Sequence, residues 1–239
     1  MLLRAASSGT ICIGQSSHAW LSGQLAWVWT PEPGLEDVWE EVCLAATQHD
    51  VGMADHDRRP LLDPGTGGPV GFTTLPLAVH LELWDAAPDR MLSTSVWAAL
   101  LVSRHGTGLY ARRDLTALDP PEAAVVRAAL ARWAAREDRW AAWTGASPEQ
   151  VERGAALLRT WDALSLALCL DWAPWTGDGV ALSEGGLLCP WPFGERAELE
   201  VRCEGRLLTG PAASRDELAA LLDAAERVDL RFTLHRGSG

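Results

Sequence analysis

Six side chains in this sequence could bind metal ions, because each lies at or beside the apolar face of a segment expected to be helical. They are His18, His49, Asp50, His80, His105 and Asp162. Neutral imidazoles and carboxylates are the ligands that suit Fe, Mn, Zn and Ni. Asp50 follows His49 directly, and a carboxylate in such a position can bridge two ions about 3.5–4 Å apart. We therefore expect one or two divalent metal ions, whose identity the residues do not distinguish.

The strongest energetic indication comes from Asp162. On a helix its side chain lies one turn from both Leu158 and Leu166, so the carboxylate is expected to be shielded from water. An unpaired buried charge costs several kcal/mol. The chain contains no Lys, and Arg159 points to another face of the helix. A metal ion is therefore an economical partner for this carboxylate.

A single histidine on an apolar face is more often a hydrogen-bonded core residue than a ligand. Four such histidines on helices that share one core shift the balance towards a metal site. Asp50 and Asp57 are candidate general bases beside the metal. Arg58 and Arg104 are candidate contacts for an anionic substrate, although solvated surface positions explain them equally well.

The elements that must position these residues follow from hydrophobic periodicity, helix caps and turn residues. We expect a hairpin over 1–15, a long Pro- and Gly-rich loop over 55–75 that serves as a lid or substrate loop, and strands with one short helix from about 177 onward. The expected helices cover 16–29, 35–49, 76–91, 95–104, 120–143 and 147–170. The helix over 95–104 is expected to end at His105, where Gly106 and Gly108 favour a tight turn.

This pattern predicts a mainly α-helical single domain over 1–239. Its helical body covers about 16–176, and a small β appendage is formed by 1–15 and 177–239.

Composition excludes several classes of protein. A net charge of −12 without a basic run disfavours a nucleic-acid partner. The longest apolar runs are far shorter than the roughly 20 residues that span a bilayer, so no membrane association is expected. The five scattered cysteines form no Cys-x-x-Cys pair and suggest reduced thiols in the cytoplasm. A small-molecule substrate is the expected partner, and the oligomeric state is not indicated.

Several segments resemble a bacterial family catalogued as domain of unknown function 3891. They include His18-Ala19-x-Leu21-Ser22-Gly23-Gln24, His49-Asp50-x-Gly52, Ser103-Arg104-His105-Gly106-Thr107-Gly108, Trp161-Asp162-x-Leu164-Ser165 and Cys189-Pro190-x-Pro192-Phe193. This resemblance covers nearly the whole chain and implies no activity.

The order His, His-Asp, His, His, Asp on successive helices is also similar to the two-metal members of the HD-domain superfamily. That resemblance implies an HD-like helical bundle, with His18, His49, Asp50 and Asp162 around one metal. It implies that His80 and His105 hold a second metal with Asp50 shared. Met53 departs from the commonest phosphohydrolase members, in which a Lys often follows the glycine, and this weakens the case for a phosphate ester.

Three functions remain open at this point. The first is a metal-dependent hydrolase that uses a metal-bound water on a small phosphate-containing or related ester. The second is a di-iron oxygenase with the same ligands. The third is a non-catalytic binding or structural protein whose His and Asp residues form buried hydrogen-bond networks.

Overall fold

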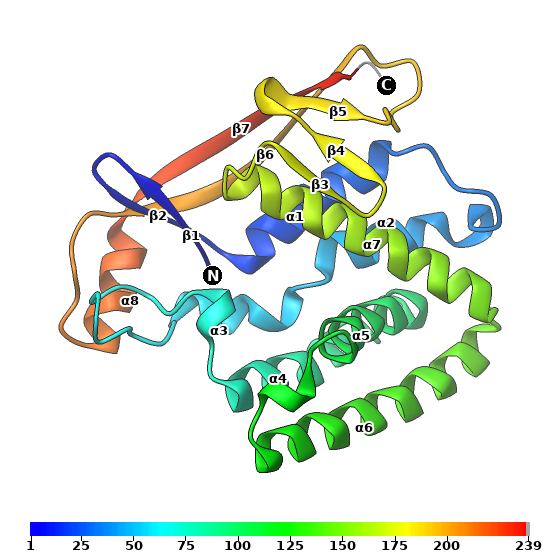
Figure 1. Cartoon of the computed structure of the whole chain (residues 1–239), viewed down its shortest axis with the longest axis horizontal. Coiled ribbons are helices and arrows are strands. Elements are labelled where there is room, and N and C mark those ends of the chain that lie inside the picture. Colours follow the sequence, from blue (N-terminus) through cyan, green and yellow to red (C-terminus); the bar gives the residue numbers. More distant parts are fainter. Residues whose placement is uncertain (238–239) are drawn as a thin grey trace.

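A seven-stranded sheet extends along one side of the molecule in the computed structural model, which describes residues 1–237 (Figure 1). The strand order is β1-β2-β6-β7-β5-β4-β3. Only β5 and β7 are parallel neighbours, and the other pairs are antiparallel. The strands are β1 (Leu2–Ala6), β2 (Gly9–Ile13), β3 (Trp175–Gly177), β4 (Val180–Leu182), β5 (Leu187–Cys189), β6 (Glu198–Leu208) and β7 (Glu226–Arg236).

This sheet corrects the predicted fold class, because the β structure is not a small appendage on an HD-like helical bundle. Helices form 55% of the chain and strands 18%, in one curled mixed sheet. The N-terminal hairpin pairs with β6 through β2, and β6 pairs with β7 along nearly its whole length. Both ends of the chain therefore form one β layer, as predicted, but this layer is a large sheet and not a small appendage.

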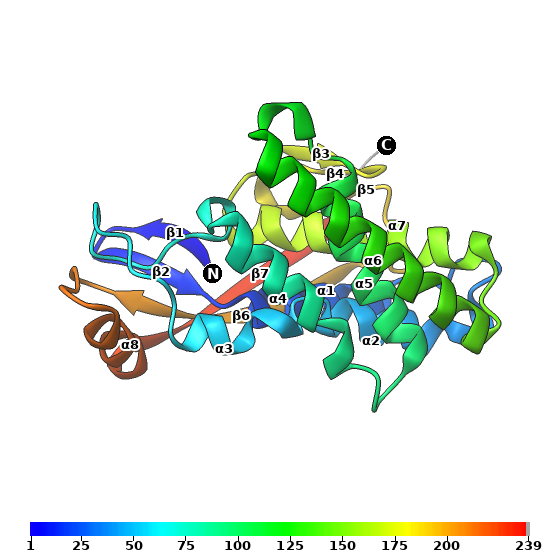
Figure 2. The same cartoon turned by 90° about the horizontal axis from the view of Figure 1, so that it is seen from below.

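The main layer of helices lies on one side of the sheet (Figures 1 and 2). Helix α8 is the exception, because its Leu218 and Leu222 pack in a separate cluster with Cys12 and Leu208. Helix α1 packs against β6, α2 and α7 pack against α1, and α5 lies between these helices and α6. The α-helices are α1 (Gln15–Val28), α2 (Trp39–Gln48), α3 (Ala54–Arg58), α4 (Leu77–Ala86), α5 (Val96–Ala111), α6 (Pro120–Thr144), α7 (Pro148–Cys169) and α8 (Arg215–Ala224). Short 3-10 turns include Val51–Met53 and Phe72–Thr74.

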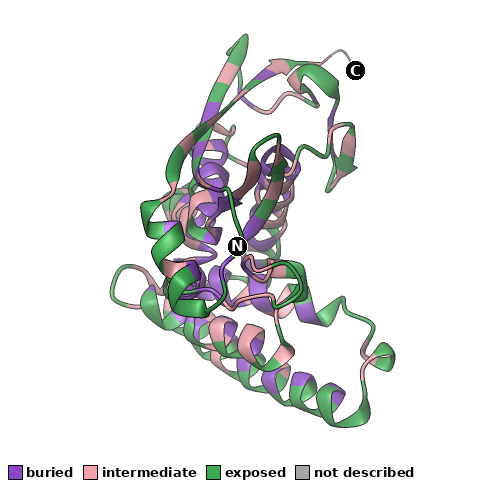
Figure 3. Ribbon diagram, turned by 90° about the vertical axis from the view of Figure 1, so that its left-hand side faces the viewer, coloured by how far each residue is buried: buried purple, intermediate pink, exposed green. Residues whose placement is uncertain are grey.

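The main hydrophobic core joins the helices to the sheet. It includes Leu25 on α1, Leu101 on α5, Trp161 on α7, Val201 on β6 and Leu234 on β7. Figure 3 shows the buried positions gathered on the inner elements, whereas the outer face of α6 is exposed. The helices that carry the candidate ligands are thus held in place by neighbouring elements on both of their faces.

Helix α5 is longer than the sequence predicted, so His105 lies within the helix and not at its end. Gly106 and Gly108 remain helical. A Cβ at Gly106 would lie 3.0 Å from the Trp84 ring of α4, so the glycine here permits a close helix–side-chain approach and does not form a turn.

Two further features concern the hydrophobicity of the helices and the state of the cysteines. Within residues 1–237, no helix combines the length and hydrophobicity needed to cross a membrane. The cysteines Cys12, Cys43, Cys169, Cys189 and Cys203 are all free thiols.

Candidate metal centre

His18 enters the centre from the first turns of α1, which packs between the sheet and α7. Its ring is buried, and Nδ1 lies 2.6 Å from the hydroxyl of Ser165 on α7. The Ser165 hydroxyl donates to the carbonyl of Asp162 at 2.8 Å, so it accepts the Nδ1 hydrogen of His18. Because the hydrogen of the neutral ring is on Nδ1, the lone pair is on Nε2, which points away from Ser165.

His49 follows the last residue of α2 and retains helical backbone angles. Its Nδ1 lies 2.9 Å from the carbonyl oxygen of Ala46, which can only accept a hydrogen bond. A hydrogen is therefore on Nδ1, so that Nε2 is the atom that either a metal ion or a second proton can occupy.

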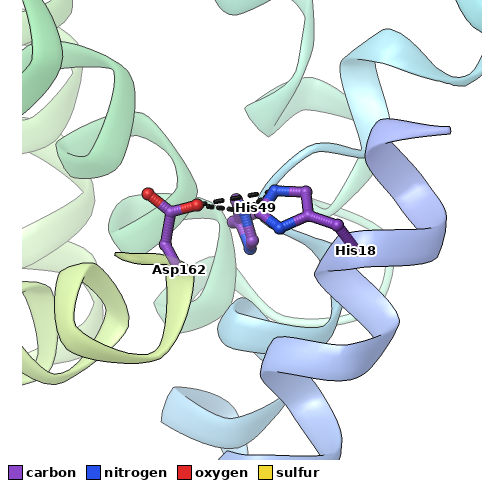
Figure 4. Close-up of side chains that lie close together, drawn as sticks. All are labelled: His18, His49 and Asp162. Atoms are coloured by element: carbon purple, nitrogen blue, oxygen red, sulfur yellow. Dashed lines mark hydrogen bonds and ion pairs between the residues drawn. The ribbon is translucent and has the colours of Figure 1, made fainter. Parts of the chain in front are cut away.

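The Nε2 atoms of His18 and His49 face each other at 3.2 Å, and Asp162 of α7 completes a triangle (Figure 4). Asp162 Oδ1 lies 3.4 Å from His49 Nε2 and 3.5 Å from His18 Nε2. We refer to His18, His49 and Asp162 as the triad. Among the described residues, these three form the group whose ligand atoms all lie close enough to hold one ion.

The triad fits a metal ion on two grounds. Ligands at about 2.0–2.1 Å from a tetrahedral ion are about 3.3–3.4 Å apart, close to the three observed separations. In addition, two neutral imidazoles cannot direct lone pairs at each other at 3.2 Å without a cation or a proton between them. A centre with His₂Asp ligands would leave the fourth position open, as catalytic zinc sites do.

Asp50 lies beside the triad, with Oδ2 2.9 Å from His18 Nε2 and 3.4 Å from His49 Nε2. Burial raises the pKa of Asp50, but the charges and hydrogen bonds of His49 and His18 outweigh burial and hold this pKa well below its usual value. Burial lowers the pKa of His49, and the charges and hydrogen bonds of Asp50 and Asp162 reverse that effect. Burial also raises the pKa of Asp162, but the hydrogen bond and charge of His49, together with the nearby histidines, lower it below its usual value. Both carboxylates therefore remain charged, and in the absence of a metal a protonated His49 is their positive partner.

His105 reaches the triad from α5. Its Nε2 lies 3.8 Å from Asp162 Oδ2, and its ring centroid lies 4.9 Å from that of His49. Burial lowers the pKa of His105 to about 4. Its Nδ1 is buried and has no hydrogen-bond partner among the described residues. The ring is thus neutral and lies next to the triad without being part of it.

His80 is not brought to the triad, although it was predicted as a metal ligand. Its Nδ1 lies 2.6 Å from the hydroxyl of Tyr110, and its Nε2 accepts a hydrogen bond from Trp84 Nε1 at 2.9 Å. Both ring nitrogens are occupied by protein partners. The second metal site that the HD resemblance implied, with His80 and His105 as ligands, is not assembled.

The buried His80 gives a pH prediction for the protein in the presence of a chelator. Burial lowers its pKa to about 4, whereas the unfolded chain binds the proton at the ordinary value near 6.5. Stability is therefore present above pH 6.5 and is lost as the pH falls towards 4, by about 3 kcal/mol for this group. Urea unfolding of the wild type and of His80→Gln should show a shallower pH dependence in the variant.

His235→Gln on β7 is the matched control for this experiment, and it should retain the wild-type slope. A His80→Gln protein with the same pH dependence as the wild type would contradict the assignment.

A cavity of about 310 Å³ opens beside the triad. Its polar lining includes His18, Asp50, His105 and Asp162, so the centre faces a space for a small molecule. Phe72, Thr73 and Leu75, from the end of the predicted lid segment, form part of its wall. The remaining lining residues are Gln15, Leu77, His80, Trp84, Leu109, Tyr110, Arg113 and Leu166.

Three other predicted site residues lie away from this cavity. Asp57 is buried in α3, where its carboxylate contacts the amino nitrogen of Met1 at 3.1 Å and accepts from the backbone N–H of Gln15. Arg104 forms ion pairs with Glu137 and Glu152. Arg58 is exposed beside α8. None of them is among the lining residues.

Sequence reasoning missed three residues that shape the site: Ser165, Tyr110 and Arg113. Ser165 shares a helical face with Asp162, a spacing that could have identified it as a partner of a ligand. Tyr110 and Arg113 were missed because α5 was expected to end at His105.

A family model with the description "Protein of unknown function (DUF3891)" matches residues 1–210. The chain belongs to this family. The DUF3891 match runs from the N-terminal hairpin past the end of β6, so it contains the whole triad and the cavity lining, and it ends before α8 and β7. No curated protein and no solved structure matches the chain. The similarity to HD-domain proteins therefore stays a prediction.

Proposed function

We propose that this DUF3891 protein is a metal-dependent hydrolase of a small ester substrate, with one divalent ion held by His18, His49 and Asp162. The observation that carries the proposal is the triangle of 3.2–3.5 Å between three ligand atoms, two of which belong to residues that line the cavity, His18 and Asp162. Zn, Mn, Fe and Ni all remain candidates for the ion.

A divalent ion in such a site polarises an ester oxygen and lowers the pKa of a bound water towards neutrality. The protein supplies the arrangement around it. Ser165 and the Ala46 carbonyl hold the two imidazoles in the tautomer that presents Nε2. Asp50 lies beside the triad and lines the cavity, where its carboxylate can accept a proton from water, and we assign it the role of general base.

The placement of His80 favours one ion over two, and it favours hydrolysis over the di-iron oxygenase alternative. A di-iron centre needs ligands for a second ion, and the Nδ1 and Nε2 atoms of His80 are paired with Tyr110 and Trp84.

Elemental analysis of protein purified without an affinity tag tests the proposal first. We expect about one equivalent of a divalent transition metal per chain. The metal-loaded protein should then hydrolyse members of a panel of small carboxylic and phosphate esters. Protein that contains no metal, and that shows the same melting temperature with and without added Zn²⁺ or Mn²⁺, would refute the proposal.

Asp50→Ala should abolish hydrolysis while the protein remains folded, because the general base is lost. Initial rates with the best ester of the panel measure this effect, and a loss of at least 100-fold is expected. Asp55→Ala is the matched control, since Asp55 is exposed and pairs with Arg90. An Asp50→Ala protein with the wild-type rate would remove Asp50 from the mechanism.

A further inference from the structure

A chain of hydrogen bonds on the cavity wall leaves one donor unused. The indole Nε1 of Trp84 can only donate, so Nε2 of His80 must accept at 2.9 Å. The neutral ring then carries its hydrogen on Nδ1, which donates to the hydroxyl oxygen of Tyr110 at 2.6 Å. The hydroxyl hydrogen of Tyr110 has no acceptor among the described residues, and Tyr110 lines the cavity.

The protonation states of His80 and Tyr110 are consistent with these hydrogen-bond directions. Burial lowers the pKa of His80 to about 4, and the nearby charge of Arg113 acts in the same direction. Burial raises the pKa of Tyr110 to about 12, and the Arg113 charge offsets part of this rise. At neutral pH the imidazole is uncharged and the phenol keeps its proton, so the phenol remains available as a donor.

Arg113 follows α5 by two residues and also lines the cavity. Its side chain is exposed, its guanidinium makes no ion pair or hydrogen bond within residues 1–237, and it is the one arginine among the lining residues. The other charged groups on the wall, Asp50 and Asp162, are neighbours of the two imidazoles. A buried donor and an exposed, unpaired cation, three residues apart in the chain, therefore line the same cavity.

We propose that Tyr110 and Arg113 form a subsite for a carboxylate or phosphate group of the substrate, distinct from the position of the bond to be cleaved. Tyr110 lies five residues beyond His105 on α5, which corresponds to about 7.5 Å along the helix axis. Leu75, Leu77 and Leu109 line the same cavity. The substrate class is thus a small molecule whose anionic group is joined through an apolar segment to the ester at the triad.

This inference rests on the proposed function for the cleavage step, but the anion subsite can be tested without a metal. Isothermal titration calorimetry with EDTA-treated protein should detect binding of hexanoate or hexyl phosphate. Hexanol, which has the same chain and no charge, should bind more weakly by at least tenfold. The two anions distinguish a carboxylate subsite from a phosphate subsite.

Arg113→Gln should weaken the binding of the preferred anion by about tenfold or more, because a charge-assisted hydrogen bond is lost. Tyr110→Phe should weaken it as well, by less. Neither variant should change the affinity for hexanol, a selectivity that a purely structural role would not produce. Arg112→Gln, at an exposed neighbouring position that does not line the cavity, is the matched control.

Each result bears on a separate claim. Equal affinities of hexanoate, hexyl phosphate and hexanol for the wild type, or an unchanged anion affinity in Arg113→Gln, would overturn the subsite. A protein that lacks metal but keeps Arg113-dependent anion binding would retain the subsite and refute the hydrolase. Because Tyr110→Phe leaves His80 Nδ1 without an acceptor, Arg113→Gln is the decisive variant if the Phe variant is unstable.

Discussion

Asp162→Asn is expected to weaken the binding of a divalent metal by at least 100-fold while preserving the fold. The change is nearly isosteric, but it removes the negative charge that completes the triad at 3.4 and 3.5 Å from the two Nε2 atoms. A neutral amide is a poor substitute for a carboxylate ligand. The loss should exceed the 10- to 100-fold effects that follow removal of an outer hydrogen-bond partner of a ligand.

The metal-dependent gain in stability measures this effect. At a free metal concentration of 100 times the wild-type dissociation constant, the wild type gains about 2.7 kcal/mol. A variant with 100-fold weaker binding gains only about 0.4 kcal/mol under the same condition. Chemical unfolding with EDTA and with added metal gives both values. The control Asp178→Asn, in the turn between β3 and β4, should behave as the wild type. If Asp162→Asn showed the same metal-dependent gain in stability as the wild type, Asp162 would not be a metal ligand.

Gly23→Ala is expected to destabilise the protein by about 1–3 kcal/mol and to weaken metal binding at the same time. A Cβ at Gly23 would lie 2.3 Å from Thr47 Oγ1 and 2.9 Å from Thr47 Cα, so α1 and α2 would have to separate. These two helices carry His18 and lead to His49. A shift between them changes the 3.2 Å separation of the two Nε2 atoms.

Urea unfolding and metal titration of the same samples test this coupling. Gly210→Ala is the matched control, because a Cβ there meets no atom within 4 Å. The double variant Gly23→Ala/Thr47→Ala should recover only part of the stability, since the contact with the Thr47 backbone remains. A Gly23→Ala protein with wild-type stability and metal affinity would show that the helices can separate at no cost.

Most of the helices could be predicted because their signals are local. Ser147-Pro148 begins α7 with a capping box, and Asp119 caps α6. The hairpin of β1 and β2 was also predicted. The end of α5 was not, because glycine favours a turn in the sequence alone, whereas the helical Gly106 is required by the contact with Trp84. That contact is not visible from the positions of the two residues in the chain.

The sheet was underestimated for a related reason. The sequence indicates strands at both ends of the chain, but their pairing depends on contacts between residues far apart, such as Ile13 with Gly205. The sequence therefore predicted only a small appendage built from both ends of the chain, whereas β6 joins the hairpin to β7 in one large sheet.

For the candidate site, the predicted residues His18, His49 and Asp162 do meet, because each lies on an apolar face that the core must bury. Asp50 and His105 lie beside them. His80 faces the same cavity but has other partners, and hydrophobic periodicity cannot distinguish these two arrangements. The partners of Asp57 and Arg104 depend on which side chains the tertiary fold places opposite them. The sequence alone therefore could not exclude these two residues from the candidate site.

The triad draws its members from widely separated parts of the chain, and the Ser165 that orients His18 is 147 residues away from it. During translation both imidazoles leave the ribosome well before the helix with the carboxylate has been synthesised. Two histidines alone bind metal weakly, so a nascent chain offers no competent chelating site. For the proposed metal centre, the complete set of ligands therefore exists only after α7 has docked against α1.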